Sequence, residues 1–360
     1  MEAYLRLVEY SSDWFEKLLP AARSRGPLFC LQYRSFVDYY YTTHPEWCRL
    51  YLAVGKDDAV IGTQGAELMR FQCNQDEKIL FFPRDYFSTQ PGVGTYLFMK
   101  WMQVSSSRGI AFGGTEQFHQ IIRALGWTYF NDIQIYYMNE PYHCHLTDGL
   151  IRRGAKWFLN QVYLKKLSEF AVRLPEWVRT EITVQEEQSF TEDMLPQHSP
   201  FSFRFAPTAE YLNWRYNTEL PFIWYRLFRI LHREKPDGYV VIGDFPERLI
   251  VAQCDSDDTV ALSYGILLSI LEAGRNDEKP RTVMLSSSHL LMRGIFEEFG
   301  FRAWYHPRPF AIGGLRVGVD IPMETSNWLV NFDWGNNGLR APFVDRASRR
   351  ALRPAVSGNR

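Results

Sequence analysis

The tripeptide Gly92-Val93-Gly94 has the composition and the position of an anion-binding loop. It is rich in glycine, follows a strand-like apolar run and opens a segment with helical periodicity. Glycine lets backbone N–H groups approach a ligand with no Cβ in the way. A helix N-terminus adds unpaired N–H donors and the positive end of the helix dipole. Together these features favour the binding of a diphosphate.

The loop differs from two familiar phosphate-binding patterns. No Gly-Lys-Ser/Thr follows it, which excludes a Walker loop, and Leu97 stands at the third glycine position of the GxGxxG dinucleotide pattern. A pair of glycines also marks many ordinary turns. A turn that only caps the helix is therefore an alternative interpretation.

Two stretches of the chain, residues 110–127 and 284–301, resemble each other. Each is a short apolar run, a small polar turn, an amphipathic helical pattern, and then glycine and an aromatic residue (Gly126-Trp127 and Gly300-Phe301). The long spacing excludes a solenoid and indicates two related domains in tandem.

The second copy has no glycine loop. The acidic segment Cys254-Asp255-Ser256-Asp257-Asp258 precedes its helix instead. These carboxylates would repel a diphosphate and would suit the helix as caps. We therefore expect only the first copy to bind a diphosphate in this way.

The elements that must position the loop alternate between strands and helices. The patterns predict strands at 3–9, 48–55, 59–73, 77–83, 110–114 and 129–138, and helices at 14–24, 35–44, 95–109 and 116–125. From residue 181 the order partly repeats, with strands at 181–190, 222–234, 239–245, 248–254 and 282–286, a turn at 235–238, and helices at 206–217, 259–274 and 289–300. This order predicts an α/β class, with a mixed α+β sheet in each unit.

Composition bounds the possible functions. The chain has 360 residues, 46 % of them hydrophobic and 22 % charged, and a net charge of −1, which indicates two globular domains and no nucleic-acid partner. Its longest apolar runs are too short for a membrane span, and its start lacks the pattern of a signal peptide. Five scattered cysteines without a CxxC pair favour reduced thiols and a cytoplasmic location.

The order of elements resembles that of the GNAT acyltransferase superfamily. The loop of that family reads Arg/Gln-x-x-Gly-x-Gly/Ala, then a small residue and a leucine; residues 89–97, TQPGVGTYL, are similar, with Thr89 at the first position and Gln90 one place off. The family's helix ending in Leu-Gly-Phe is matched by Leu-Gly-Trp at 125–127 and Phe-Gly-Phe at 299–301. The resemblance covers most of residues 1–140 and, more loosely, 180–310.

The resemblance implies a cofactor and its binding residues. The backbone of the loop would hold the pyrophosphate of acetyl-CoA or another acyl-CoA as co-substrate, with no metal. The pantetheine arm would lie where the strand around Phe81-Phe82 diverges from the strand at 110–114. The residues implied in cofactor binding are Gln90, Gly92, Val93, Gly94 and Thr95.

The chain departs from the family at the general acid. Many members have a tyrosine four residues before the glycine of the helix end, where it protonates the departing thiolate. Ile122 and Phe296 stand at these places in the two copies, and neither can donate a proton. The acid therefore stays open, and the stretch between Pro83 and Gly92 looks longer than usual.

Attack by an amine also needs a base, or a water path, to remove its proton. Glu67, on the strand before the loop strand, is the first candidate, and Glu116, which shares one helix face with His119, is the second. Each could instead be an ordinary surface or ion-paired group. Asp85 follows the loop strand and could be a turn residue.

A metal site is not expected. His143 and His145 would share one face of a strand around Cys144, but the sequence offers no matching Cys/His pair, and tetrahedral zinc needs four ligands.

We expect four segments along the chain: an N-terminal GNAT-like domain with the CoA loop (1–140), a connector (141–179), a C-terminal GNAT-like domain with a degenerate loop (180–340) and a basic tail (341–360). The second domain could shape the acceptor site or support a homodimer.

The leading hypothesis is an acyl-CoA-dependent N-acyltransferase that acts on a small-molecule or protein amine. The alternative is a catalytically inactive GNAT-like binding or scaffold protein. A third hypothesis is aminoacyl transfer from a charged tRNA, against which the near-neutral charge argues.

Overall fold

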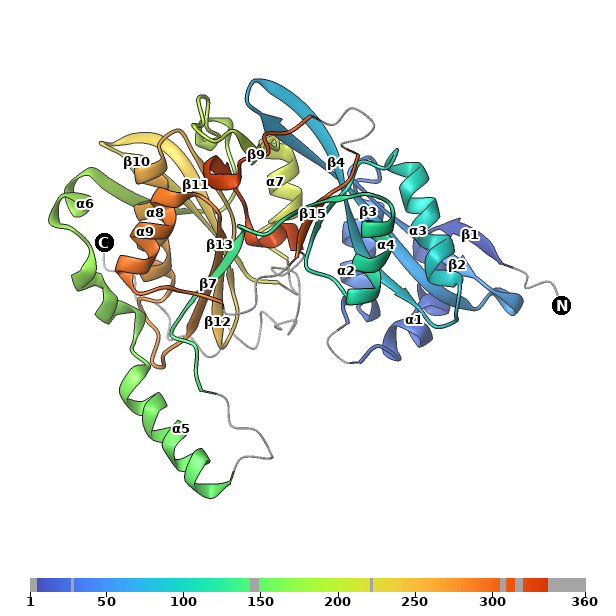
Figure 1. The fold of residues 1–360 in the computed structure, drawn as a ribbon, viewed down its shortest axis with the longest axis horizontal. Helices are drawn as coiled ribbons and strands as arrows, with labels where there is room; N and C mark the ends of the chain where they lie inside the picture. Colours follow the sequence, from blue (N-terminus) through green and yellow to red (C-terminus); the bar gives the residue numbers. More distant parts are fainter. Residues whose placement is uncertain are drawn as a thin grey trace.

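The computed structural model describes residues 5–26, 29–142, 149–220, 223–304, 309–314 and 320–335. The first half of the chain runs from strand β1 to strand β7 (Figure 1). Its strands are β1 (Arg6–Glu9), β2 (Cys48–Val54), β3 (Val60–Cys73), β4 (Asp76–Ser88), β5 (Ile110–Phe112), β6 (Thr128–Phe130) and β7 (Gln134–Met138). Its α-helices are α1 (Phe15–Arg23), α2 (Arg34–Thr42), α3 (Val93–Val104) and α4 (Glu116–Ala124).

The second half repeats this order after helix α5 (Leu150–Tyr163) and helix α6 (Glu176–Glu181). Its strands are β8 (Ile182–Glu187), β9 (Phe203–Phe205), β10 (Tyr225–His232), β11 (Lys235–Asp244), β12 (Arg248–Ser256), β13 (Thr282–Ser287), β14 (Arg302–Ala303), β15 (Phe310–Ile312) and β16 (Trp328–Leu329). Its other helices are α7 (Ala209–Arg215), α8 (Thr259–Ala273) and α9 (Leu290–Phe299), followed by a short 3-10 helix, η8 (Phe332–Gly335). The run β2-β3-β4-α3-β5-α4 thus corresponds to β10-β11-β12-α8-β13-α9.

Two large mixed sheets lie side by side (Figure 1). One has the order β1-β2-β3-β9-β16, with β4 also paired to β3, and the other has the order β14-β7-β13-β12-β11-β10-β8. The mixed α/β class and the duplicated arrangement that the sequence predicted are confirmed.

The two halves exchange strands. Strand β7 of the first half pairs with β13 in the second sheet, where Met138 lies opposite Val283. Strand β15 of the second half pairs with both β5 and β6, so that Phe310 lies opposite Phe112 and Phe130. A domain boundary near residue 140 stays a prediction, but each half completes its partner's sheet structure.

The apolar core also crosses between the halves. Phe71 of β3 stacks on Phe203 of β9, with ring centroids 4.9 Å apart, and Tyr40 of α2 meets Trp214 of α7 at 5.5 Å. Buried aromatic pairs of this kind stabilise by more than their area alone. The halves therefore pack as one body.

Several predicted elements differ in their bounds. The single strand expected at 129–138 is two strands, because Asn131-Asp132 interrupts it and sends β6 and β7 to different sheets. The turn expected at 235–238 lies instead at Arg233-Glu234, both with positive φ, and His232 pairs with Lys235.

The helices are close to the prediction. Helix α1 continues through Pro20 to Arg23, close to the end expected at residue 24. The connector expected at 141–179 contains a fourteen-residue helix, α5, which projects from the body of the molecule (Figure 1).

Among the described residues, no helix combines the length and the apolar character that crossing a bilayer requires.

Candidate functional site

The N-terminus of α3 is open toward solvent. Gly92 precedes the helix with a φ of 81°, in the left-handed region that favours glycine, and makes no side-chain cap. The first bond of the helix runs from the Tyr96 N–H to the Gly92 carbonyl at 3.2 Å. By contrast, the side chains of Thr115 and Asp258 cap α4 and α8. The first turn of α3 thus keeps the N–H donors that bind an anion.

The five residues implied in cofactor binding lie around this turn. Gln90, Gly92 and Thr95 are exposed, whereas Val93 and Gly94 are buried. The Val93 side chain packs in a small apolar cluster beneath the helix, so this residue can offer only its backbone to a ligand.

Two hydroxyl groups that the sequence analysis did not single out also lie at this helix end. A Cβ placed on Gly94 would overlap the Tyr86 hydroxyl and would lie 3.2 Å from Ser88 Oγ. Gly94 is therefore required for the close approach of the two side chains. Both come from β4 and, being two residues apart, face the same side of the strand, which is the signal that could have found them.

The pairing of β4 and β5 breaks off next to these groups and leaves a gap in the sheet ladder. The Phe81 N–H donates to the Arg108 carbonyl at 2.9 Å, and Phe81 forms one isolated parallel bridge to Gly109. Beyond this point β5 pairs with β15 instead. The two strands diverge at Phe81, where the resemblance placed the divergence.

A bulge shapes β4 beside the gap. The register between β3 and β4 shifts after Thr63, and Asp85 takes a φ of 46°. Its carboxylate accepts hydrogen bonds from the Cys30 thiol at 3.0 Å and from the Tyr41 hydroxyl. Burial, and then the charge of Asp85, raises the pKa of the Cys30 thiol. Asp85 is thus an anchored group inside the strand and not a turn residue.

Glu67 lies at the centre of a buried charge network. Its carboxylate is 2.9 Å from Arg84 Nη1 of β4 and 3.1 Å from Arg215 Nε of α7, and it accepts a hydrogen bond from the Tyr211 hydroxyl. Arg215 Nη2 in turn lies 3.0 Å from Asp333 in η8. The network therefore links both halves of the chain.

The electrostatics of Glu67 follow from these neighbours. Burial alone would raise the pKa of its carboxyl, but the positive charges of Arg215 and Arg84 outweigh burial and hold the pKa below its ordinary value. Glu67 is ionised and fully enclosed, with both oxygens bonded.

Glu116 and His119 lie on α4 in different surroundings. Glu116 is exposed and lies 3.1 Å from Arg123 Nη1. His119 is buried and bonds the Tyr129 hydroxyl at 2.9 Å and the Gly113 carbonyl at 3.0 Å, just after β5. Burial lowers the pKa of His119, so its ring is neutral. The structure does not bring Glu67 and Glu116 together.

The corresponding helix end in the second half is closed. The Asp258 carboxylate accepts the Ala261 N–H at 2.7 Å at the start of α8. The neighbouring Asp255 is buried and paired with Arg204, and burial raises its pKa to about 6 despite the opposing charge of that arginine. The acidic segment thus caps the helix, as expected from the sequence.

The chain itself fills the second gap. Strands β12 and β13 pair only from Arg248 to Ile250, and residues after β16 contact both strands beyond that point. The Asn331 side chain accepts the Cys254 N–H at 2.9 Å, and the Val330 carbonyl accepts the Ser286 hydroxyl at 2.8 Å. The same segment also contacts β5, where the Phe332 ring of η8 lies 6.5 Å from that of Phe112.

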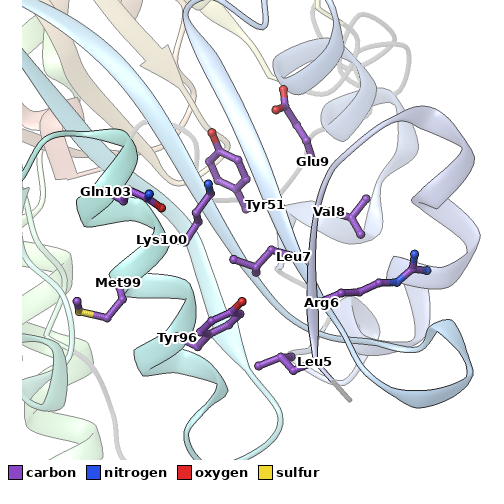
Figure 2. Close-up of a pocket in the computed structure, with 10 residues that line it drawn as sticks. All are labelled: Leu5, Arg6, Leu7, Val8, Glu9, Tyr51, Tyr96, Met99, Lys100 and Gln103. Atoms are coloured by element: carbon purple, nitrogen blue, oxygen red, sulfur yellow. The ribbon is translucent and has the colours of Figure 1, made fainter. Parts of the chain in front are cut away.

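A separate open groove of about 870 Å³ lies between β1 and α3 (Figure 2). Figure 2 shows Leu5 and Leu7 on one wall and Tyr96 and Met99 on the other. Its lining includes no residue of the 89–95 loop, and β1 lies across β2 and β3 from β4. The helix end and the strand gap, which have the donors for an anion, are the better candidate site.

His143, Cys144 and His145, where the sequence argued against a metal, lie outside the described residues. Within the described ranges no cluster of three or more His, Cys, Asp or Glu side chains is arranged to hold a metal ion.

Comparison with known proteins identifies the fold. Neither a protein-family model nor a curated protein sequence matches the chain. Among solved structures, a GCN5-related N-acetyltransferase from Kribbella flavida superposes with a TM-score of 0.53 at 13 % identity, over 86 % of this chain and 71 % of that one. The chain has the GNAT fold.

Two further GNAT-like structures agree. The GCN5-related N-acetyltransferase from Anabaena variabilis gives a TM-score of 0.50 at 9 % identity, over 86 % of this chain and 72 % of that one. The Saccharomyces cerevisiae N-myristoyltransferase with bound myristoyl-CoA gives 0.52 at 8 % identity, over 86 % and 82 %. Matches at such low identity show the GNAT fold and leave the substrate open.

Proposed function

We propose that this chain is an acyl-CoA-dependent N-acyltransferase that transfers an acyl group, with acetyl the simplest case, to an amine. One observation carries the proposal: in the first half, the uncapped N-terminus of α3 follows the strand β4, whose pairing with the parallel strand β5 ends at Phe81. In the second half, a side chain caps the helix and the chain fills the gap.

The proposed binding mode uses groups already in place. The N–H groups of Val93, Gly94 and Thr95, with the hydroxyls of Tyr86 and Ser88, would bind the diphosphate of CoA. The pantetheine arm would then run into the gap that opens at Phe81.

The reaction needs few groups. The amine nitrogen attacks the thioester carbonyl carbon, the C–N bond forms, the C–S bond breaks, and the amine loses a proton to a base or to water. Glu116 and Glu67 stay the candidate bases. Glu116 is accessible in the first turn of α4, whereas the ion pairs of Glu67 make its carboxylate a weak base, suited to holding β3, β4 and α7 in place.

A second candidate function, binding without catalysis, is favoured by one feature. Ile122 stands where many GNAT enzymes have a tyrosine acid, and it is fully buried. Tyr86, whose hydroxyl lies at the start of α3, is the tyrosine of β4 and is 40 % exposed.

The test places a negative charge at the N-terminus of α3, where the fold tolerates it. Thr95→Glu puts a carboxylate in the first turn of α3. There it stabilises the helix, because it interacts favourably with the helix dipole, but it repels a diphosphate. We expect its affinity for CoA and acetyl-CoA, measured by calorimetry, to fall about tenfold or more, with stability within about 1 kcal/mol of the parent. Thr95→Gln is the neutral control.

Thr259→Glu, at the first turn of α8, is the matched control in the second half. It should leave affinity unchanged and the stoichiometry at one acyl-CoA per chain. If Thr95→Glu and Thr95→Gln bind CoA with equal affinity, the CoA diphosphate does not bind at the N-terminus of α3. Binding without any transfer to a panel of amines would favour the second candidate function.

A further inference from the structure

Helix α5 exposes an apolar face that no described part of the chain covers. None of its fourteen residues is buried. Leu150 and Ile151 are 87 % and 90 % exposed, and Trp157 and Val162 are each 63 % exposed. Folded chains seldom leave this many bulky side chains uncovered on one helix, and such exposure marks an interaction site.

The polar side of α5 is the side attached to the molecule. The Asn160 side chain accepts the Tyr142 N–H at 2.7 Å and donates to the Tyr142 carbonyl at 3.1 Å. One turn further, the Tyr163 ring meets Tyr142 at 6.0 Å and lies 5.3 Å from the guanidinium of Arg302. These contacts orient the helix, with its apolar side turned away from its attachment.

Helical periodicity separates the two sides. At 100° per residue, Ile151, Phe158 and Val162 lie within one narrow stripe. Arg152 and Lys156 lie on the same side of the helix as Asn160, away from the apolar stripe. Trp157 lies between the apolar stripe and the polar side of the helix. In a helix lying on a membrane, this position is at the membrane–water interface, where tryptophan is enriched.

The charge of the segment indicates what it contacts. Helix α5 carries three cations, Arg152, Arg153 and Lys156, and no carboxylate, and Lys165 and Lys166 follow it, in a chain whose net charge is −1. A second copy of this helix would bring like charges together, whereas an anionic surface complements them. A basic amphipathic helix with exposed aromatic side chains is typical of an interfacial membrane helix.

We propose that α5 binds this chain peripherally to an anionic lipid bilayer, with its apolar stripe in the headgroup region and its cations among the lipid phosphates. Figure 1 shows α5 projecting beyond the two sheets, so that it can reach a flat surface. The proposal concerns a site separate from α3 and does not depend on acyl transfer.

The experiment is co-sedimentation of the full chain with large vesicles of phosphatidylcholine, alone or mixed with phosphatidylglycerol. We expect binding to the mixed vesicles only, weakened by salt because surface attraction is screened. Phe158→Asp combined with Ile151→Asp should abolish it. Leu290→Asp, which changes an equally exposed leucine at the start of α9, is the control that should keep it.

A second variant removes cations and leaves the apolar residues of α5 in place, so that a loss of binding is not due to an altered apolar face. Replacing Arg152, Lys165 and Lys166 with glutamine should weaken binding about fivefold per removed cation. Three results would overturn the proposal: no binding to either vesicle, equal binding to neutral and anionic vesicles, or a dimer in solution that the Phe158→Asp variant dissociates, since a second copy would then cover the stripe.

Discussion

The Glu67 carboxylate of β3 lies 3.1 Å from Arg215 Nε of α7, so that a buried ion pair joins the two halves of the chain. Both side chains are almost fully enclosed. Arg215 continues the chain of charges to Asp333, and Glu67 continues it to Arg84. The relative placement of the halves thus depends on charges that cannot be left unpaired.

Removing Arg215 should therefore be costly. Arg215→Leu leaves Asp333 without its arginine and Glu67 with one cation instead of two. We expect the free energy of unfolding in urea to fall by about 3–5 kcal/mol. Arg123→Leu removes an exposed ion pair with Glu116 and should change it by less than about 1 kcal/mol.

Similar losses in these two variants would show that the buried network contributes no more than a surface pair. A loss in Arg215→Leu that is confined to one of two unfolding transitions would show that the halves unfold separately.

The Gly94–Tyr86 contact predicts a non-additive pair of variants. Gly94→Ala improves helix propensity but displaces the Tyr86 hydroxyl from the helix end. We expect unchanged or higher stability and weaker CoA binding, and Tyr86→Phe should weaken binding by about 2- to 13-fold, the range for one hydrogen bond. The double variant should bind no more weakly than Gly94→Ala alone. Additive losses would place Tyr86 outside the site.

His119 should make stability depend on pH. Burial holds its folded pKa below the ordinary value of 6.5. As the pH falls through 6.5, the unfolded chain takes up a proton that the folded chain does not, so this contribution to stability is present at pH 7.5 and is lost on acidification.

The measurement is urea unfolding between about pH 7.5 and 5.5, a window either side of the ordinary histidine pKa. The wild type should lose more stability on acidification than His119→Gln, whereas His198→Gln, at an exposed position, should follow the wild type. Parallel curves for the wild type and His119→Gln would contradict the prediction.

Asn331 should be essential to the closed gap of the second half. Its side chain bonds both the N–H and the carbonyl of Cys254, and the carbonyl has a second donor in Gln253 Nε2 at 3.4 Å, so Asn331→Ala removes the described partner of the N–H alone. The expected loss is about 1–3 kcal/mol, the cost of one buried unpaired group. Acyl-CoA stoichiometry should stay at one per chain. A rise to two would mean that Asn331 alone blocks a second site.

Much of the site and the fold could be predicted from local sequence. The glycine loop, the strand before it and the helix after it follow from residue types within a few positions, as does the acidic cap of α8. The resemblance between residues 110–127 and 284–301 indicated the duplication, because a repeated unit keeps its order of elements.

The exchange of β7 and β15 could not be predicted. A strand's periodicity tells which face is buried, but not which sheet receives it, and the two strands join sheets formed mainly by the opposite half. The bulge that places Asp85 inside a strand, and not in the expected turn, could not be predicted either. A bulge is defined by how two strands pair, and this one arises from the register of β4 against β3.

The sequence by itself determined the composition of the anion loop and which of the two copies retains it, because helix caps and glycine conformations are local. Only the tertiary structure decided that Glu67 is an enclosed ion-paired group, that Tyr86 joins the loop, and that Asn331 fills the second gap. The partners of these residues come from separate elements, up to 148 residues apart for the Glu67–Arg215 pair (215 minus 67). Burial and pairing at that range arise from packing, which no local pattern encodes.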